Sequence, residues 1–366
     1  MPEIAQLIET HLSSYCAFGN PGSLHRLGVS AMESFSNSRR RVASVLGAQP
    51  EEIIFTSGGT ESINFAIRGY LEANPRKGKH VISTRTEHKA TLAVLDYLSN
   101  HGHEVTYIGV DSAGEPNWLE VERAIRPDTA LLTFTHVNNE TGAILPVRKL
   151  VDIRNRINRS AVIHLDCVQS LGKLPLRPSK DGVELVSMSG HKIHAVKGVG
   201  AIYIKSGIRM QPLIIGGGQQ GGLRSGTEST FLAEAFALAL EKSYEQSDAA
   251  YLKLTHIHND VSSVIQSFGG VILSPENGSK YILNAALPMF EAETLLHALE
   301  EHDIFISTVS ACASKNKKAS HVLAAMGIDK SLSRSAVRIS FSRFSQAEDI
   351  EQINKALGEA IKRYAL

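Results

Sequence analysis

The chain has 366 residues, of which 43% are hydrophobic and 20% charged, so it can form a large α/β domain and a smaller second domain. Its formal net charge of +1 disfavours a nucleic-acid-binding or membrane-surface protein. The three cysteines, Cys16, Cys167 and Cys312, are widely separated, so neither a disulfide framework nor a metal site is expected. Because no signal peptide or bilayer-spanning apolar stretch is visible, we expect a cytoplasmic protein without direct membrane or nucleic-acid contacts.

Seven short β-branched runs alternate with helical patterns through the first part of the chain. They cover residues 53–56, 80–83, 105–108, 130–134, 162–165, 184–187 and 200–204. Amphipathic segments separate most of them, for example 90–98 and 147–157. This alternation predicts a mostly parallel sheet covered by helices on both faces, with ligands bound at the carboxyl ends of its strands.

The pattern changes after residue 231. Two long helical segments, at 232–244 and 251–268, precede strand-like runs near Val271, at 281–287, near Ile304 and at 337–341. Helices lie between these runs and at the end of the chain, which predicts a smaller α+β domain. We place the large domain at residues 12–245 and the small domain at 246–366, with residues 1–11 packing near the small one.

Lys192 stands in the run Ser189-Gly190-His191-Lys192, directly after a predicted strand. A lysine at a strand's carboxyl end can enter a pocket as an amine that attacks an aldehyde, because desolvation lowers the pKa of its ammonium group. A lone lysine of this kind is usually a surface residue. The interpretation therefore depends on the neighbouring motifs.

Asp166 ends an apolar strand, where a carboxylate is costly to bury unless a cation pairs with it. A protonated pyridine nitrogen is such a cation, and Gln169, three residues later, can donate to a phenolic oxygen of the same ring. A helix N-cap is an equally good interpretation of Asp166 from its own sequence context.

Three further motifs follow predicted strands. The glycine-rich turn in residues 55–62 leads into a helix and suits a phosphate, although it is neither a Walker A loop nor a dinucleotide fingerprint. His88 could stack on a cofactor ring and exchange protons, and Asn139 could reach the cofactor or substrate. Alone, His88 also fits an ordinary helix start, and Asn139 fits a tight turn.

These motifs occur in the order found in cysteine desulfurases of the NifS/IscS-like group, and the sequence resembles that group over almost its whole length. The other matching stretches are 18–25, 136–142, 216–227, 310–312 and 337–340. The group belongs to the class V aminotransferase family of fold-type I pyridoxal-phosphate enzymes. The resemblance implies a large domain with a mixed, mostly parallel seven-stranded sheet and a smaller α+β C-terminal domain.

The resemblance also implies a role for each motif. Lys192 is covalently attached to pyridoxal 5'-phosphate, Asp166 pairs with the pyridine nitrogen, and Gln169 pairs with the phenolic oxygen. His88 stacks on the ring and takes part in catalysis. The phosphate is bound by Gly59, Thr60, Ser189 and His191.

Two other implied roles concern the substrate and the oligomer. Asn139 lies near both the ring and the substrate, and Arg338 holds the substrate carboxylate with its guanidinium group. Thr227 matches a residue that reaches the phosphate of the neighbouring subunit, which implies a homodimer with shared active sites.

Cys312 resembles the family's nucleophilic cysteine. It stands in the polar, lysine-rich segment 307–318, which we expect to be mobile and exposed. Such a loop suits a thiolate that takes sulfur at the cofactor and carries the persulfide to an acceptor protein. The implied reaction converts L-cysteine to L-alanine, and the sulfur could serve iron–sulfur cluster assembly or tRNA thiolation.

Two alternatives stay open. A selenocysteine lyase or another fold-type I enzyme would also use Lys192 and Asp166. A catalytically impaired homologue is the second alternative, because the family's Ala-Thr-Thr-Pro-like N-terminal stretch has no counterpart in this sequence. In addition, Thr308-Val309 replaces a Gly-Ser-type pair before Cys312, and β-branched residues are stiffer than glycine.

Overall fold

The computed structural model describes residues 1–13, 18–308 and 320–364. Its larger sheet has seven strands in the order β1-β7-β6-β5-β4-β2-β3. These are β1 (Ile53–Thr56), β2 (His80–Thr84), β3 (Glu104–Ile108), β4 (Thr129–Thr135), β5 (Val162–Asp166), β6 (Leu185–Ser189) and β7 (Gly200–Ile204). β7 runs antiparallel to its neighbours β1 and β6, whereas β2 to β6 pair in parallel. The predicted mixed, mostly parallel sheet is confirmed.

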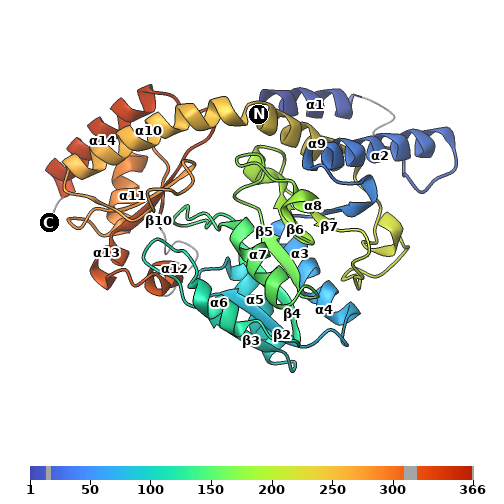
Figure 1. Cartoon of the computed structure of the whole chain (residues 1–366). Helices are drawn as coiled ribbons and strands as arrows, with labels where there is room; N and C mark the ends of the chain where they lie inside the picture. The colour runs from blue at the N-terminus through green and yellow to red at the C-terminus, as the bar shows by residue number, and fades with distance from the viewer. Residues whose placement is uncertain (14–17, 309–319, 365–366) are drawn as a thin grey trace.

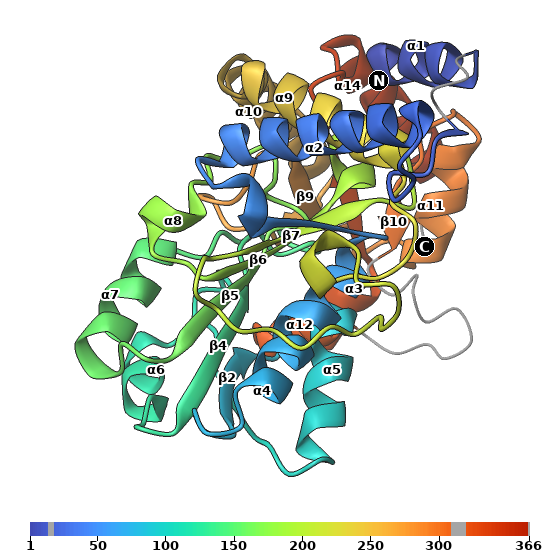
Figure 2. The ribbon, with the colours of Figure 1, turned by 90° about the vertical axis from the view of Figure 1, so that its right-hand side faces the viewer.

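Helices cover both faces of this sheet because alternate strand residues point to opposite sides. Phe55 and Leu132 face a core shared with α2 (Arg26–Leu46), α6 (Trp118–Ala124), α7 (Val147–Ile157) and α9 (Thr230–Glu245). Ile54 and Leu131 face the core beneath α3 (Gly59–Asn64), α4 (Tyr70–Ala73) and α5 (Lys89–Ser99). Figure 2 shows α6 and α7 on one side of the strands and α3, α4 and α5 on the other. The remaining short helix of this part is α8 (Pro178–Asp181).

A second, antiparallel sheet follows in the order β10-β11-β9-β8. Its strands are β8 (Val271–Ile272), β9 (Ile282–Ala286), β10 (Ser307–Thr308) and β11 (Ala336–Ser340). The helices of this part are α10 (Ser247–Ser267), α11 (Ala292–Glu300), α12 (His321–Ala325), α13 (Lys330–Arg334) and α14 (Glu348–Tyr364). Buried residues of α10, α11 and α14 pack against β9 and β11 in a separate core (Figure 1). The strand predicted near Ile304 begins three residues later, at Ser307.

The chain passes from the larger-sheet part to the smaller-sheet part where α9 ends and α10 begins, with Gln246 between these helices. The domain boundary that we placed after residue 245 stays a prediction. The N-terminal helix α1 (Pro2–Leu12) lies beside α9 in Figure 1, and its Ile4 is buried in the core of the larger sheet.

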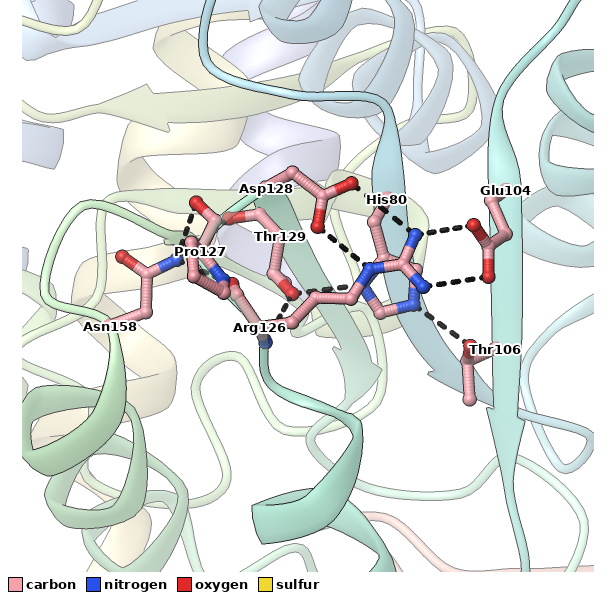
Figure 3. Close-up of polar contacts among 8 residues, drawn as sticks. All are labelled: His80, Glu104, Thr106, Arg126, Pro127, Asp128, Thr129 and Asn158. Atoms are coloured by element: carbon pink, nitrogen blue, oxygen red, sulfur yellow. Dashed lines mark hydrogen bonds and ion pairs between the residues drawn. The ribbon is translucent and has the colours of Figure 1, made fainter.

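The amino ends of β2, β3 and β4 are tied together by a polar network (Figure 3). His80 lies between two hydroxyl oxygens, those of Thr106 and Thr129, at 2.8 Å each. Arg126 donates from Nη1 to Glu104 Oε1 at 2.8 Å and from Nε to Asp128 at 2.7 Å. Because this edge is opposite the carboxyl ends of the strands, we interpret the network as structural.

Candidate active site

The central strands bring their carboxyl ends together at one edge of the larger sheet. In the strand register, Asp166 at the end of β5 lies opposite Thr135 of β4 and Ser187 of β6. The chain then leaves β6 at Ser189 and reaches Lys192 within a short 3-10 turn. The predicted cofactor residues therefore come from adjacent strand ends, as expected for a site on a parallel sheet.

Asp166 is 4% exposed, and its Oδ1 accepts a hydrogen bond from the backbone N–H of Val168 at 2.9 Å. Burial raises the pKa of this carboxyl from 3.8 to about 6, and the hydrogen bond opposes the rise. The N-cap interpretation is wrong, because the residues after Asp166 form turns and not an α-helix. A buried carboxylate in this position is stabilised by a cation brought next to it.

A second buried carboxyl, that of Glu87, lies near Asp166. Its two oxygens accept hydrogen bonds from the hydroxyls of Thr84 at 2.8 Å and Thr135 at 2.6 Å. Burial, together with the negative charge of Asp166, raises the pKa of Glu87 to about 8, although the threonine hydrogen bonds oppose the rise. Glu87 therefore favours its neutral form over a wider pH range than an exposed glutamate does. Sequence reasoning missed this residue, since only the fold reveals its burial.

The predicted phosphate loop joins β1 to α3. Gly58 has φ of 154°, a conformation that side-chain-bearing residues rarely adopt. A Cβ on Gly59 would come within 2.8 Å of Val168 Cγ2 and 3.5 Å of Ser189 Cβ. Ser189 Oγ in turn lies 3.0 Å from His191 Nδ1. Gly59, Ser189 and His191 thus lie together, and Thr60 is exposed beside them.

His88 caps the N-terminus of α5, where its Nδ1 accepts a hydrogen bond from the N–H of Ala90 at 3.1 Å. In the neutral ring the proton is therefore on Nε2. Although solvent reaches the ring, the surrounding protein displaces enough water to lower the pKa of His88, and the charge of Lys192 lowers it further. The lowered pKa favours the neutral imidazole.

Asn139 and Arg338 are neighbours, as the resemblance implies. Arg338 Nη1 donates to the backbone oxygen of Asn139 at 3.0 Å, and Nη2 donates to Ser307 Oγ at 3.1 Å. The loop that carries Asn139 is fixed by Asn138, whose amide donates to the backbone oxygen of Thr86 at 2.8 Å. Arg338 thereby connects the smaller sheet to the edge of the larger one.

Cys312 lies outside the described residues. On one side of its segment, Ser307 accepts from Arg338. On the other side, the hydroxyl of Ser320 donates to the carboxylate of Glu140, whose pKa is raised by burial. His321, the next residue, has its Nε2 3.0 Å from the backbone oxygen of Glu87. The described residues on both sides of the segment thus contact the site.

Thr227 is exposed and lines a surface pocket with Ser57, Gln220 and Arg224. Arg224 forms an ion pair with Glu61 of α3, next to the phosphate loop. The predicted contact of Thr227 with a neighbouring subunit stays a prediction. Among the described residues, no group of three or more His, Cys, Asp or Glu side chains could hold a metal ion.

Comparison with known proteins gives the class of the protein. The family model for aminotransferase class V matches residues 2–353, so the chain belongs to that family. The predicted family is confirmed, and the family depends on pyridoxal phosphate. In the parts of the chain that the structure describes, no helix has the length and apolar character needed to cross a membrane.

Within the family, the chain is a homologue of the cysteine desulfurases. It is 37% identical to cysteine desulfurase IscS of Klebsiella pneumoniae subsp. pneumoniae, with 98% of this chain and 90% of that protein covered. A solved structure described as a NifS-like protein superposes with a TM-score of 0.93 and 34% identity, covering 99% of this chain and 96% of the other. A structure of SspA in complex with cysteine matches with a TM-score of 0.82 and 30% identity, covering 93% and 96%.

Proposed function

We propose that this chain is a pyridoxal-phosphate-dependent cysteine desulfurase that converts L-cysteine to L-alanine and receives the sulfur on Cys312 as a persulfide. One observation supports this most strongly. Asp166 is buried at the centre of the strand ends, where a cation next to its carboxylate would stabilise the buried charge. The relatives' names, cysteine desulfurase, and the order of the sequence motifs support the same activity.

The residues present fit the proposed cofactor. The buried Asp166 suits a protonated pyridine nitrogen, and the space beside Gly58, where a Cβ would have only Ser189 Oγ within 4.0 Å, suits a phosphate. Thr60 and His191 border the same space, and Gln169 lies within the turn that follows Asp166. When bound through Lys192, the cofactor supplies an electron sink for the bonds that break at the substrate.

The chain's own residues would then share the remaining work. Arg338, assisted by Asn139, would orient the substrate carboxylate, since a guanidinium group binds a carboxylate with two hydrogen bonds. The Lys192 amine would take the proton from the substrate Cα and return it, with the neutral imidazole of His88 as a second proton carrier at Nε2. The Cys312 thiolate would attack the substrate sulfur, so that an S–S bond forms as the C–S bond breaks.

A homodimer belongs to the same proposal. The surface of α2 and the loop before it exposes large apolar residues, among them Leu24 at 97% exposure, Leu27 and Met32. The segment that contains Thr227 lies beside α2, because Arg39 of α2 donates to Gln220 at 3.4 Å. Exposed apolar surface of this kind marks a protein contact, which would place Thr227 near a second copy. A sulfur-acceptor protein and a cytoplasmic location complete the proposal.

The test is an assay of the purified, cofactor-loaded protein. We expect alanine to form from L-cysteine, with a mass increase of one sulfur atom on Cys312. Cys312→Ser should abolish sulfide release and the modification while retaining the cofactor's visible absorbance. The matched control, Cys16→Ser, should retain both. Sulfide release that survives Cys312→Ser would refute the persulfide step and favour a lyase.

A further inference from the structure

We propose that Lys173 is a positioning residue for the cofactor: it holds the Gln169 amide with its nitrogen toward the ring and places a positive charge beside Lys192. This inference rests on the proposed function. It assigns a task to a residue to which the resemblance gives no role.

The first observation is a directional hydrogen bond. Lys173 Nζ donates to Gln169 Oε1 at 3.2 Å. While Lys173 is protonated, below its pKa of about 7, its ammonium group has only donors, whereas an amide has one acceptor end and one donor end. Rotating the amide by half a turn would place its NH₂ group against the ammonium, donor against donor. The lysine therefore selects the orientation in which the NH₂ group of the Gln169 amide is left to donate a hydrogen bond to a phenolic oxygen.

The second observation is the environment of Lys173. Its Nζ lies 5.4 Å from the ring centroid of Tyr281, a cation–π contact. It also lines a small pocket with Lys192, His194 and Arg343. A lysine with only a structural role would add little stability to the fold from a position among several basic groups. The arrangement is explained if an anionic ligand occupies the space that these groups share.

Lys173 and the charged groups around it change one another's pKa values. Burial, together with the positive charges of Lys192 and Arg338, lowers the pKa of Lys173 to about 7. Lys173 in turn lowers the pKa of His194, whose own value is about 4 mainly because of burial. Repulsion between Lys173 and Lys192 is mutual, so a charge on Lys173 disfavours a proton on the Lys192 nitrogen.

The test is a spectroscopic pH titration of the cofactor-loaded protein, which follows the proton on the Lys192 nitrogen in the visible spectrum. Lys173→Met removes the charge and the donor, so we expect the titration midpoint to rise by about one pH unit. Lys173→Arg keeps both and should leave the midpoint near that of the wild type. Lys180→Met, at an exposed lysine of α8, is the matched control and should not shift it.

Repeating the titration in the Gln169→Leu variant separates the effect of amide orientation from the effect of the Lys173 charge. In Gln169→Leu there is no amide to orient, so Lys173→Met should shift the midpoint less than it does in the wild type. An equal shift in both backgrounds would overturn the positioning role. An unchanged midpoint in Lys173→Met, while the wild type titrates, would overturn the whole inference. A wild-type protein that takes up no cofactor would instead overturn the proposed function, and this inference with it.

If Lys173→Met does not fold, which melting of the cofactor-free protein would show, Lys173→Gln replaces it. Glutamine keeps a donor for Gln169 Oε1 but has no charge. It should therefore shift the midpoint upward by less than methionine does, and a midpoint equal to that of the wild type would contradict the electrostatic part.

Discussion

Replacing Asp166 with asparagine should stabilise the cofactor-free protein and weaken cofactor binding. The folded protein holds this carboxyl at a pKa of about 6, against an ordinary value of 3.8. Asparagine keeps the oxygen that accepts from the Val168 N–H at 2.9 Å and has no charge to bury. The substitution therefore removes the cost of the buried charge without removing its local hydrogen bond.

The magnitude follows from linkage between protonation and folding. Between pH 3.8 and about 6 the unfolded chain releases the Asp166 proton while the folded chain retains it, so stability falls as pH rises through this window. The pKa difference of about 2 corresponds to about 3 kcal/mol, lost in full above pH 6. The cofactor-free variant should match the wild type near pH 4 and exceed it by up to about 3 kcal/mol at pH 8.

The assay is urea unfolding of the cofactor-stripped proteins from pH 4 to pH 8, with Asp152→Asn at an exposed position of α7 as the control. With cofactor present the order should reverse, because the variant has no carboxylate to pair with the pyridine nitrogen. Affinity for the cofactor should fall by about 100-fold or more. A cofactor-free variant that is less stable than the wild type at every pH would refute the reasoning.

Four further outcomes are expected. Glu87→Gln should stabilise the cofactor-free protein increasingly between pH 4.5 and about 8, by more than about 2 kcal/mol at pH 8, and a flat difference across this range in urea unfolding would contradict it. Gly59→Ala places a Cβ 2.8 Å from Val168 Cγ2, so it should lower the melting temperature and weaken cofactor binding about tenfold in a fluorescence titration, and unchanged cofactor binding would contradict it. Glu184→Gln leaves the buried Arg154 without its ion pair, so unfolding free energy should fall by about 3 kcal/mol. Arg338→Lys should raise KM for cysteine about tenfold without changing cofactor affinity, and an unchanged KM would exclude Arg338 from carboxylate binding.

Most strands of the larger sheet were predictable because they are short apolar runs buried on both faces, whereas the edge strand β3 is only partly buried. β5 and β7, for example, are buried at every position. The two-residue strand β10 was misplaced near Ile304, since a pair of residues carries no periodic pattern. Short strands of this kind are defined by their partner, here β11, and not by their own sequence.

The site was only partly predictable. Asp166 and Lys192 stand next to strands with clear patterns, so their place at one edge of the sheet followed from the rule for parallel sheets. The environments of Glu87 and Lys173 did not follow, because their burial comes from segments distant in sequence, such as β4 and the residues around Tyr281. Sequence patterns identify which residues leave the strand ends, whereas perturbed pKa values depend on the assembled fold.

The attachment of the cofactor can be located directly. Borohydride reduction of the loaded protein makes the link to its lysine permanent, and peptide mass spectrometry then identifies that lysine. We expect the cofactor mass on the peptide that contains Lys192, with none on the neighbouring Lys173. Cofactor found on Lys173 or on an exposed lysine, or absent from every peptide, would contradict the assignment of Lys192.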